Sequence, residues 1–391
     1  MKFKYPLASS SWGEEEINSI YKVVESGNFT MGEKVKEFEK EFCKSFGSKY
    51  ALMTNSGSSA NLLMIGALFY TQDKRFRLKR GDEVIVPAVS WSTSYIPLYK
   101  YGLKLKFVDI DIETLNYDLD NLEKAITKKT RLILIVNLLG NSNDFNKINE
   151  FIKIRNNKVF IIEDNCESLG AKYEKKYCGN FGLMASHSSF FSHHISTMEG
   201  GIISTNNEEL FHILLSLRAH GWTRDLPIKN KLCKKDSNDK FKENFRFILP
   251  GYNLRPIEFS GAIGIEQLKK FNKFIKIRRQ NAEIFKKIFE GSSNFIIQKE
   301  IGQSSWFGFS LIIKENSKFN RLSLIEKLDN LGIEYRPIVS GNFVKNEVIK
   351  YFDYEIFGDL KNANYLDKNG LFIGNHHYPI EDKIMKLKYI F

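Results

Sequence analysis

The chain has 391 residues, which at roughly 100 to 200 residues per domain predicts two or three packed units and excludes a short peptide or a lone binding module. Hydrophobic residues make up 42% and charged residues 27% of the chain, and these globular values argue against disorder, a collagen-like sequence or a coiled coil. Lysine and arginine (58) outnumber aspartate and glutamate (46), so the net charge is +12 with the histidines neutral. We therefore expect a folded, soluble protein that is basic overall.

The distribution of that charge argues against a nucleic-acid partner. The densest cationic stretch, residues 229–242, also contains Asp236 and Asp239, and it lacks the interleaved aromatic residues of a single-strand platform. A solvated loop is the better interpretation, and a diffuse positive charge also suits a small phosphate-bearing substrate.

The cysteines and the start of the chain indicate the compartment. Cys43, Cys166, Cys178 and Cys233 form no Cys-x-x-Cys pair, and their spacing matches neither a zinc site nor a disulfide scaffold, so we expect reduced thiols and no metal. The first residues lack the apolar core of a signal peptide, and no run approaches the ~18 apolar residues that span a bilayer. These patterns predict a cytoplasmic protein without a membrane partner.

Alternating helices and strands predict the fold class. Helical apolar spacing occurs at residues 59–69 and 119–125. Short runs rich in Val, Ile or Leu occur at residues 83–86, 105–108, 132–136, 159–162 and 201–204. Such runs, bounded by Gly, Pro, Asp or Asn, are typical of strands buried on both faces of a mainly parallel sheet. The pattern predicts a large α/β domain over residues 1–265.

The pattern changes beyond residue 264. A long helix is predicted over residues 266–289, a strand over 306–313 and another helix over 322–331. We therefore expect a smaller α+β domain, residues 266–391, that closes over the first.

Three polar segments follow predicted strands, where parallel sheets collect their ligands. The first, Asn-Ser-Gly-Ser-Ser-Ala at residues 55–60, leads into an apolar helix. Free backbone amides and the helix dipole favour an anion there, so Gly57 and Ser58 are candidates for a phosphate site. A simple N-cap in a tight turn is the alternative.

The second segment brings Asp164 to the end of a buried strand. A buried carboxylate needs a cationic partner, which a protonated cofactor ring would supply, although a helix cap explains the residue equally well. The third segment, residues 188–201, contains the neighbours His193 and His194 before a Gly-Gly turn. Their spacing does not favour zinc, so one histidine as general acid/base or a plain surface pair remain open.

The three segments occur in the order seen in fold-type I enzymes that use pyridoxal phosphate. The chain resembles the DegT/DnrJ/EryC1/StrS superfamily of sugar aminotransferases, which acts on nucleotide-linked keto sugars. The resemblance covers essentially the whole chain and includes Tyr-Pro-Leu-Ala-Ser-Ser from residue 5, Pro-Ala-Val-Ser-Trp-Ser-Thr from 87, Ala-His-Gly-Trp-Thr-Arg from 219, Pro-Gly-Tyr-Asn from 250 and Ser-Ser-Trp-Phe-Gly-Phe from 304. It implies a fold-type I aminotransferase-like architecture.

One departure from the family pattern is informative. In the family a Ser-Phe-x-x-x-Lys segment supplies the lysine that holds the cofactor, and here His194 stands at the place of that lysine. A branch of the superfamily with histidine there removes a hydroxyl instead of installing an amine. Imidazole moves protons but cannot bind the cofactor covalently as lysine does. The resemblance therefore implies a C3 dehydratase of a nucleotide-linked 4-keto-6-deoxy sugar, most closely a GDP-linked hexose, with a heptose left open.

The resemblance also assigns the cofactor contacts. Non-covalent pyridoxal phosphate or pyridoxamine phosphate would be held by Asp164 at the ring nitrogen, by Trp91 stacked on the ring and by Glu167 near the ring hydroxyl. The residues implied at its phosphate are Gly57, Ser58, Ser189 and Asn253, the last reaching across from the partner subunit of a homodimer.

The remaining implied features concern the reaction. L-Glutamate would regenerate the amine form of the cofactor, and His220 is a second candidate acid/base. Arg224, Arg255 and Arg336 are all candidates for the diphosphate or the glutamate carboxylate, because bidentate anion recognition favours arginine.

Three rival interpretations remain. Iron–sulfur relatives carry a Cys-x-Cys step that this chain lacks, so we expect no cluster. An ordinary aminotransferase is disfavoured because no lysine lies within residues 189–201. A non-catalytic, cofactor-binding regulator is the remaining alternative.

Overall fold

The computed structural model describes residues 3–236 and 238–388. The two predicted domains begin at residue 1 and end at residue 391, so their outer limits lie outside the described residues.

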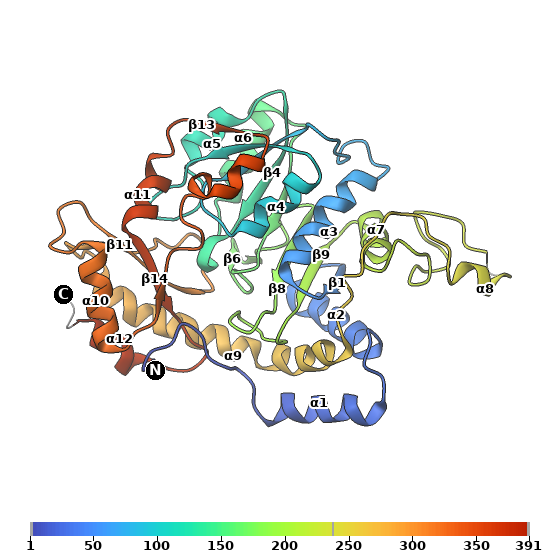
Figure 1. The fold of residues 1–391 in the computed structure, drawn as a ribbon, viewed down its shortest axis with the longest axis horizontal. Coiled ribbons are helices and arrows are strands. Elements are labelled where there is room, and N and C mark those ends of the chain that lie inside the picture. The colour runs from blue at the N-terminus through green and yellow to red at the C-terminus, as the bar shows by residue number, and fades with distance from the viewer. Residues whose placement is uncertain (1–2, 237, 389–391) are drawn as a thin grey trace.

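An eight-stranded, mostly parallel sheet forms the centre of the molecule (Figure 1). From one edge to the other its strands are β1 (Tyr50–Thr54), β9 (Gly201–Thr205), β8 (Met184–Ser188), β5 (Phe160–Asp164), β4 (Thr130–Val136), β2 (Glu83–Pro87), β3 (Lys104–Val108) and β13 (Tyr354–Phe357). The strands from β8 to β13 run parallel, whereas β9 is antiparallel to both β1 and β8. The predicted α/β class is confirmed, and all five predicted runs are strands of this sheet.

Helices cover both faces of the sheet, which explains why its strands read as continuous apolar runs. Alternate residues of one strand enter different cores: Leu132 and Leu134 of β4 pack on one face, and Ile133 and Ile135 pack on the other. The first face is covered by α3 (Gly57–Tyr70), α4 (Ser92–Lys100) and α7 (Glu208–Arg218). The second is covered by α5 (Leu119–Ala125) and α6 (Phe145–Arg155).

The second part of the chain forms a four-stranded antiparallel sheet with flanking helices. Its strands are β10 (Phe295–Ile296), β11 (Gly308–Ile313), β14 (Gly370–Gly374) and β12 (Tyr335–Arg336). Its helices are α10 (Arg321–Leu331), α11 (Lys361–Asn369) and α12 (Glu381–Leu387), with the short 3₁₀ helices η2 (Phe343–Lys345) and η3 (Glu347–Tyr351). The predicted strand and the predicted helix at residues 322–331 are confirmed as β11 and α10.

Helix α9 (Glu258–Phe289) joins the two parts and packs against α1 (Glu14–Ser26) and α2 (Glu33–Phe46). The predicted boundary at residue 265 falls inside this helix, and β13 returns to the large sheet, so the two-domain division stays a prediction. Small residues hide the first turns of α9 from an apolar pattern. They are needed for close packing, because a Cβ on Gly261 would lie 2.5 Å from the backbone nitrogen of Val35.

Minor elements complete the fold. A hairpin of β6 (Lys172–Tyr173) and β7 (Lys176–Tyr177) and the 3₁₀ turn η1 (Leu138–Gly140) lie among the connections of the large sheet. Residues 226–236 and 238–248, which we call the arm, carry the short helix α8 (Lys240–Glu243) and project away from the sheet beyond α7 (Figure 1).

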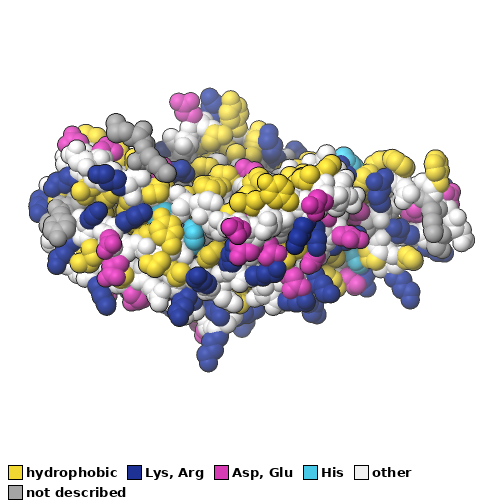
Figure 2. Space-filling view, turned by 90° about the horizontal axis from the view of Figure 1, so that it is seen from below, with side chains coloured by type: hydrophobic (Ala, Val, Ile, Leu, Met, Phe, Trp, Pro, Cys, Tyr) yellow, Lys and Arg dark blue, Asp and Glu magenta, His cyan; other side chains and the backbone are white. Residues whose placement is uncertain are grey.

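The distribution of charged side chains on the surface can be compared with the expected diffuse positive charge. On the face in Figure 2, Lys and Arg side chains are spread among Asp and Glu and do not gather in one patch. In residues 3–236 and 238–388, no helix is long and apolar enough to cross a membrane. Within the same described residues, no group of three or more His, Cys, Asp or Glu side chains is arranged to hold a metal ion.

Candidate active site

A cavity of about 450 Å³ lies between the carboxyl ends of the parallel strands and the small antiparallel sheet. Its lining comes from the starts of α3 and α4, the end of β5, the loop after β8, and the chain around β12. It is lined by Leu7, Ala8, Ser56, Gly57, Ser58, Asn61, Ser90, Trp91, Thr93, Ser94, Val136, Leu138, Asp164, Cys166, Glu167, Ser188, Phe190, Ser192, His193, Glu199, Phe307, Arg336, Pro337, Val339 and Phe372. Strand ends in a parallel sheet place chemistry at this edge, as the sequence predicts.

Asp164 forms the floor of the cavity at the end of β5. Its Oδ2 accepts hydrogen bonds from Asn61 Nδ2 at 2.8 Å and from Ser94 Oγ at 2.7 Å. Its Oδ1 accepts from the backbone N–H of Cys166 at 3.2 Å. Turns and not a helix follow β5, so Asp164 caps no helix. A nearly buried carboxylate that is oriented by neutral donors suits a cationic ligand.

The first turn of α3 forms a second part of the wall. Ser56 is the N-cap, because its Oγ accepts from the backbone N–H of Ser59 at 3.1 Å. The same turn lines the cavity with Gly57 and Ser58, so the N-cap and the ligand interpretations hold together. A Cβ on Gly57 would lie only 2.8 Å from the Cβ of Ser188, so only glycine lets the two segments approach this closely. Free amides at this helix start suit a phosphate.

Trp91 and Glu167 line the cavity as well. Trp91 precedes α4, and 57% of its surface is exposed. Glu167 accepts a hydrogen bond from the backbone N–H of Leu139 at 3.0 Å. Burial, reinforced by the nearby Asp164, raises the pKa of Glu167 to about 7. The Glu167 carboxyl therefore exchanges a proton near neutral pH, unlike an ordinary surface glutamate.

The two adjacent histidines point to different places. His193 lines the cavity, whereas His194 is only 1% exposed, does not line it, and directs Nε2 to the carbonyl oxygen of Ser305 at 3.3 Å. Because a carbonyl only accepts, Nε2 of His194 carries the proton. The sequence-based choice of His194 therefore stays a prediction that the geometry does not favour, because the neighbouring side chains diverge and the one that faces the cavity is His193.

The preceding serines show the same one-residue difference. Ser188, the last residue of β8, lines the cavity. Ser189 is fully buried, and its Oγ lies 2.6 Å from Thr197 Oγ1. Ser189 is therefore placed away from the cavity, and Ser188 takes its place as the candidate phosphate contact.

The remaining predicted residues lie elsewhere. His220 is half-buried, has a left-handed φ of 61° and packs against Trp222. Asn253 is exposed and its Oδ1 accepts from Arg255 Nε at 3.0 Å. Neither His220 nor Asn253 is among the described residues that line the cavity. Their predicted roles stay predictions, and that of Asn253 requires a partner subunit.

The three candidate arginines are separated by their position. Arg224 lies over the rings of Trp222 and Phe245, and Arg255 also lies against Trp222. Arg336 alone of the three lines the cavity, from β12.

Several cavity residues were not expected from the sequence, among them Asn61, Ser94, Glu199 and Phe307. One of them left a recognisable signal: Asn61 is a lone amide in the otherwise apolar run of residues 60–69. Ser94 and Glu199 left none, because polar residues at the start of a helix or in a loop are ordinary.

Comparison with known proteins shows the family of the chain. The model of the DegT/DnrJ/EryC1/StrS aminotransferase family matches residues 10–384, and the chain belongs to that family. It is 58% identical over 384 residues to a GDP-4-keto-6-deoxy-D-mannose 3-dehydratase of Yersinia pseudotuberculosis, covering 98% of this chain and 97% of that protein.

Solved structures agree with this similarity. The E. coli GDP-4-keto-6-deoxy-D-mannose 3-dehydratase with bound hydrated PLP is 57% identical, with full coverage of both chains and a TM-score of 0.97. A variant of GDP-4-keto-6-deoxymannose-3-dehydratase (ColD), in which a histidine and the serine directly before it are changed to lysine and asparagine, is also 57% identical. It covers 98% of this chain and 100% of its own, with a TM-score of 0.95.

Proposed function

We propose that this chain removes the C3 hydroxyl of GDP-4-keto-6-deoxy-D-mannose, using pyridoxal and pyridoxamine phosphate with L-glutamate as co-substrate. The products are the GDP-linked 3,6-dideoxy-4-keto sugar, 2-oxoglutarate and ammonia. The balance closes, because glutamate supplies the two electrons that replace a C–O bond with a C–H bond. The observation that carries the proposal is the histidine-for-lysine cavity of a chain 58% identical to such dehydratases. The same dehydratase has been solved with a trapped PLP-glutamate geminal diamine and, as a histidine-to-asparagine mutant, with bound GDP-perosamine.

The cavity residues fit the cofactor. The turn at Gly57, too tight for any Cβ, leaves backbone amides for a phosphate, and Ser58 and Ser188 add hydroxyls. Asp164 offers an oriented carboxylate for a protonated ring nitrogen, and Trp91 offers an indole face at the rim. When bound, the cofactor supplies an electron sink for loss of the C3 hydroxyl.

His193 is the proposed acid/base residue. In the ColD variant the changed histidine directly follows a serine. In this chain Ser-His occurs at residues 186–187 and 192–193, and only the second pair lines the cavity. Burial, then the charge of Arg278, lowers the pKa of His193 to about 4, so its imidazole is uncharged at neutral pH and can accept a proton. No lysine is among the described residues that line the cavity, so none there can hold the cofactor covalently.

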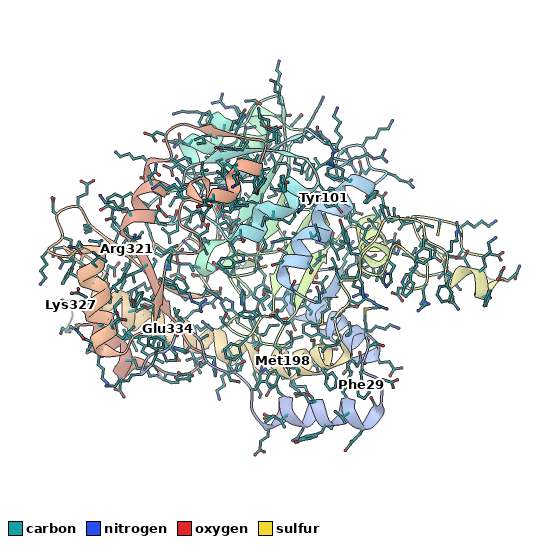
Figure 3. All side chains as sticks on the ribbon, in the orientation of Figure 1. Phe29, Tyr101, Met198, Arg321, Lys327 and Glu334 are labelled. Atoms are coloured by element: carbon teal, nitrogen blue, oxygen red, sulfur yellow. The ribbon has the colours of Figure 1, made fainter. Side chains whose placement is uncertain are left out.

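A homodimer is part of the proposal. Phe190, Phe191 and Met198, from the loop beside the cavity, expose 41 to 48% of their surface. Figure 3 places Met198 next to α9 and Phe29, also about half exposed, near the end of α1. The arm, although rich in lysine, also exposes Ile228, Phe241, Phe245 and Phe247, each by more than half. Exposed apolar surface of this extent suits a second copy, which would bring Asn253 to the neighbouring cavity.

The reaction is tested by product balance. Purified protein is incubated with GDP-4-keto-6-deoxy-D-mannose, L-glutamate and pyridoxal phosphate, and ammonia, 2-oxoglutarate and the sugar nucleotide are quantified over time. We expect one ammonia and one 2-oxoglutarate for each deoxysugar. An aminated sugar nucleotide as the main product would instead identify an aminotransferase, and no turnover of any GDP- or CDP-linked keto sugar would favour a regulator.

The assembly and compartment are tested separately. Light scattering should give the mass of two chains, and Phe245→Asp in the arm should shift the protein toward a single chain. We also propose a cytoplasmic enzyme, since all four cysteines are free thiols. If the unmodified protein is active and its mass is that of a single chain, the shared active site is contradicted.

A further inference from the structure

Behind the two histidines lies a buried arginine that the proposed function does not use. Arg278 of α9 is 5% exposed. Its Nη1 donates to the carbonyl oxygens of Asn375 at 2.9 Å, Phe307 at 3.2 Å and Trp306 at 3.5 Å. Within the described residues its side chain donates to these carbonyls alone, and its Nε has no hydrogen-bond partner. A buried charge held only by carbonyl dipoles is costly, which points to a role beyond stability.

The same short turn contacts both histidines. The ring of Phe307 lies 5.1 Å from that of His193 and 5.7 Å from that of His194. The carbonyl of Ser305, two residues earlier, accepts from His194. Residues 305–307 therefore stand between the arginine and the histidine pair, with one set of carbonyls on Arg278 and another on His194.

We propose that Arg278 is a positioning residue for the proton transfer assigned to His193: it fixes the 305–307 turn against which both rings pack, and it places a buried positive charge behind them. The inference rests on the role proposed for His193. The inference requires a positive charge near the His193 ring and no carboxylate on the α9 side that would cancel this charge.

The charged groups around the pair fit this arrangement. On the cavity side His193 shares its lining with Asp164, Glu167, Glu199 and Arg336. On the α9 side the cations are Arg278 and its neighbour Arg279, whose charge acts on His194. His376 and His377 also lie near Arg278, and burial and then Arg278 lower the pKa of each.

The directions of the histidine pKa shifts agree with this geometry. Burial first and Arg278 second lower the pKa of His193 to about 4, in spite of the three carboxylates on the cavity side. The same two causes hold the pKa of His194 well below its usual range. Burial also lowers the pKa of Arg278 itself, to about 10, which still leaves it charged at neutral pH.

The test follows the ring of His193 by NMR in protein labelled on its seven histidines, with the signal assigned from His193→Asn. The unmodified protein should show no His193 titration near pH 6.5. Arg278→Gln should raise its midpoint by about one pH unit, because a neighbouring charge of like sign is lost. Arg278→Lys, which keeps the charge, should restore the low midpoint.

Arg279→Gln is the matched control. Arg279 is the adjacent arginine of α9 and also donates to carbonyls, those of Ser304 and Gly170, at 2.9 and 3.0 Å. We expect this variant to leave the His193 midpoint unchanged. If Arg278→Gln does not fold, Arg278→Met removes the same charge with an apolar side chain.

The outcomes separate this inference from the proposed function. A His193 midpoint near 6.5 in the unmodified protein, or one unmoved in a folded Arg278→Gln or Arg278→Met variant, overturns the inference and leaves Arg278 a structural clamp. Full dehydration by His193→Asn overturns the role of His193, and the NMR midpoint is still measurable because it needs no turnover. If the roles of Arg278 and His193 are both correct, the loss of kcat/KM on the acidic side of the pH profile should begin at a higher pH in Arg278→Gln than in the unmodified protein.

Discussion

Two walls of one cavity differ in how their polar groups are satisfied. On the binding wall, which we define as Asn61, Ser94 and Asp164, both carboxylate oxygens of Asp164 accept hydrogen bonds at 2.7 to 3.2 Å, and Asn61 Oδ1 is the one buried polar atom of these three side chains without a partner among the described residues. On the histidine wall, defined as His193, which lines the cavity, together with His194, Ser305 and Arg278 behind it, each side chain has a buried polar atom without a partner among the described residues. Side chains whose polar atoms are already hydrogen-bonded hold a ligand in one orientation, whereas side chains with unpaired polar atoms stay free to exchange protons. We therefore propose that the binding wall holds the ligand and that the histidine wall carries out the proton transfer.

The largest expected effect concerns the histidine wall. His193→Asn should lower dehydration by on the order of 100- to 10,000-fold, because general acid/base catalysis is lost at the only histidine that lines the cavity among the described residues. His194→Asn is the matched control and should cost far less turnover, since that ring faces Ser305 and not the cavity. Ammonia release at saturating substrate measures both. Equal losses would show that the two rings cannot be separated in function.

The binding wall gives the next largest effect. Asp164→Asn should lower turnover by on the order of 100- to 1000-fold, because a preorganised charge opposite the ligand is removed. Its cofactor affinity should fall as well, in contrast to His193→Asn. A titration of pyridoxal phosphate followed by absorbance checks this, with circular dichroism as the control for folding. Unchanged affinity would contradict the assignment of binding to this wall.

A smaller effect is expected at the start of α3. Gly57→Ala should weaken cofactor binding about tenfold, since the added methyl would meet Ser188 Cβ at 2.8 Å and Cys166 Sγ at 3.0 Å and push the turn outward. Ser58→Ala, which removes only a hydroxyl, is the control and should cost less. Fluorescence titration of the cofactor compares them. Identical affinities in all three proteins would remove this turn from the phosphate site.

The smallest effect on activity is expected away from both walls, at His187. Burial lowers the pKa of His187 to about 3 in the folded protein, against about 6.5 when unfolded. The unfolded state therefore binds the extra proton as the pH falls below 6.5, so the stability due to this group is present above that pH and is lost below it. Between pH 7 and pH 5 the loss should be about 2 kcal/mol.

Urea unfolding at the two pH values, at one protein concentration, measures this loss. His187→Gln should lose about 2 kcal/mol less than the unmodified protein between pH 7 and pH 5. The same acid sensitivity in both proteins would mean that His187 takes up its proton in the folded state.

Periodic patterns predicted the sheet well because its strands are buried on both faces. The runs at residues 83–86 and 132–136 lie in β2 and β4 almost residue for residue. They did not reveal that β9 runs antiparallel, because a buried run has no direction in its composition. The start of α9 was missed for a related reason: its small residues serve close packing against α2 and weaken the apolar period.

The site was predicted in part. Asp164, Gly57 and Ser58 line the cavity as expected, since each stands at a recognisable strand end or turn, and Trp91 and Glu167, which the family resemblance implied, line it as well. In the two doublets, Ser188-Ser189 and His193-His194, the residue that lines the cavity is the one directly before the residue chosen from the sequence. Sequence alone cannot resolve such a doublet, because both members carry the same chemical group.

The amino-acid sequence by itself determined the α/β class, the family, the positions of the strand ends and the replacement of the expected lysine by histidine. Only the tertiary structure decided which serine and which histidine meet the cavity. Ser188 ends β8 in register with Gly201, and the chain beyond it folds back so that Ser189 hydrogen-bonds with Gly200 and Thr197. Adjacent side chains on such a backbone point to opposite sides, so a shift of one residue exchanges the cavity for the core. Chemistry can be read from residue types, but the direction in which a side chain faces is set by the packing around it.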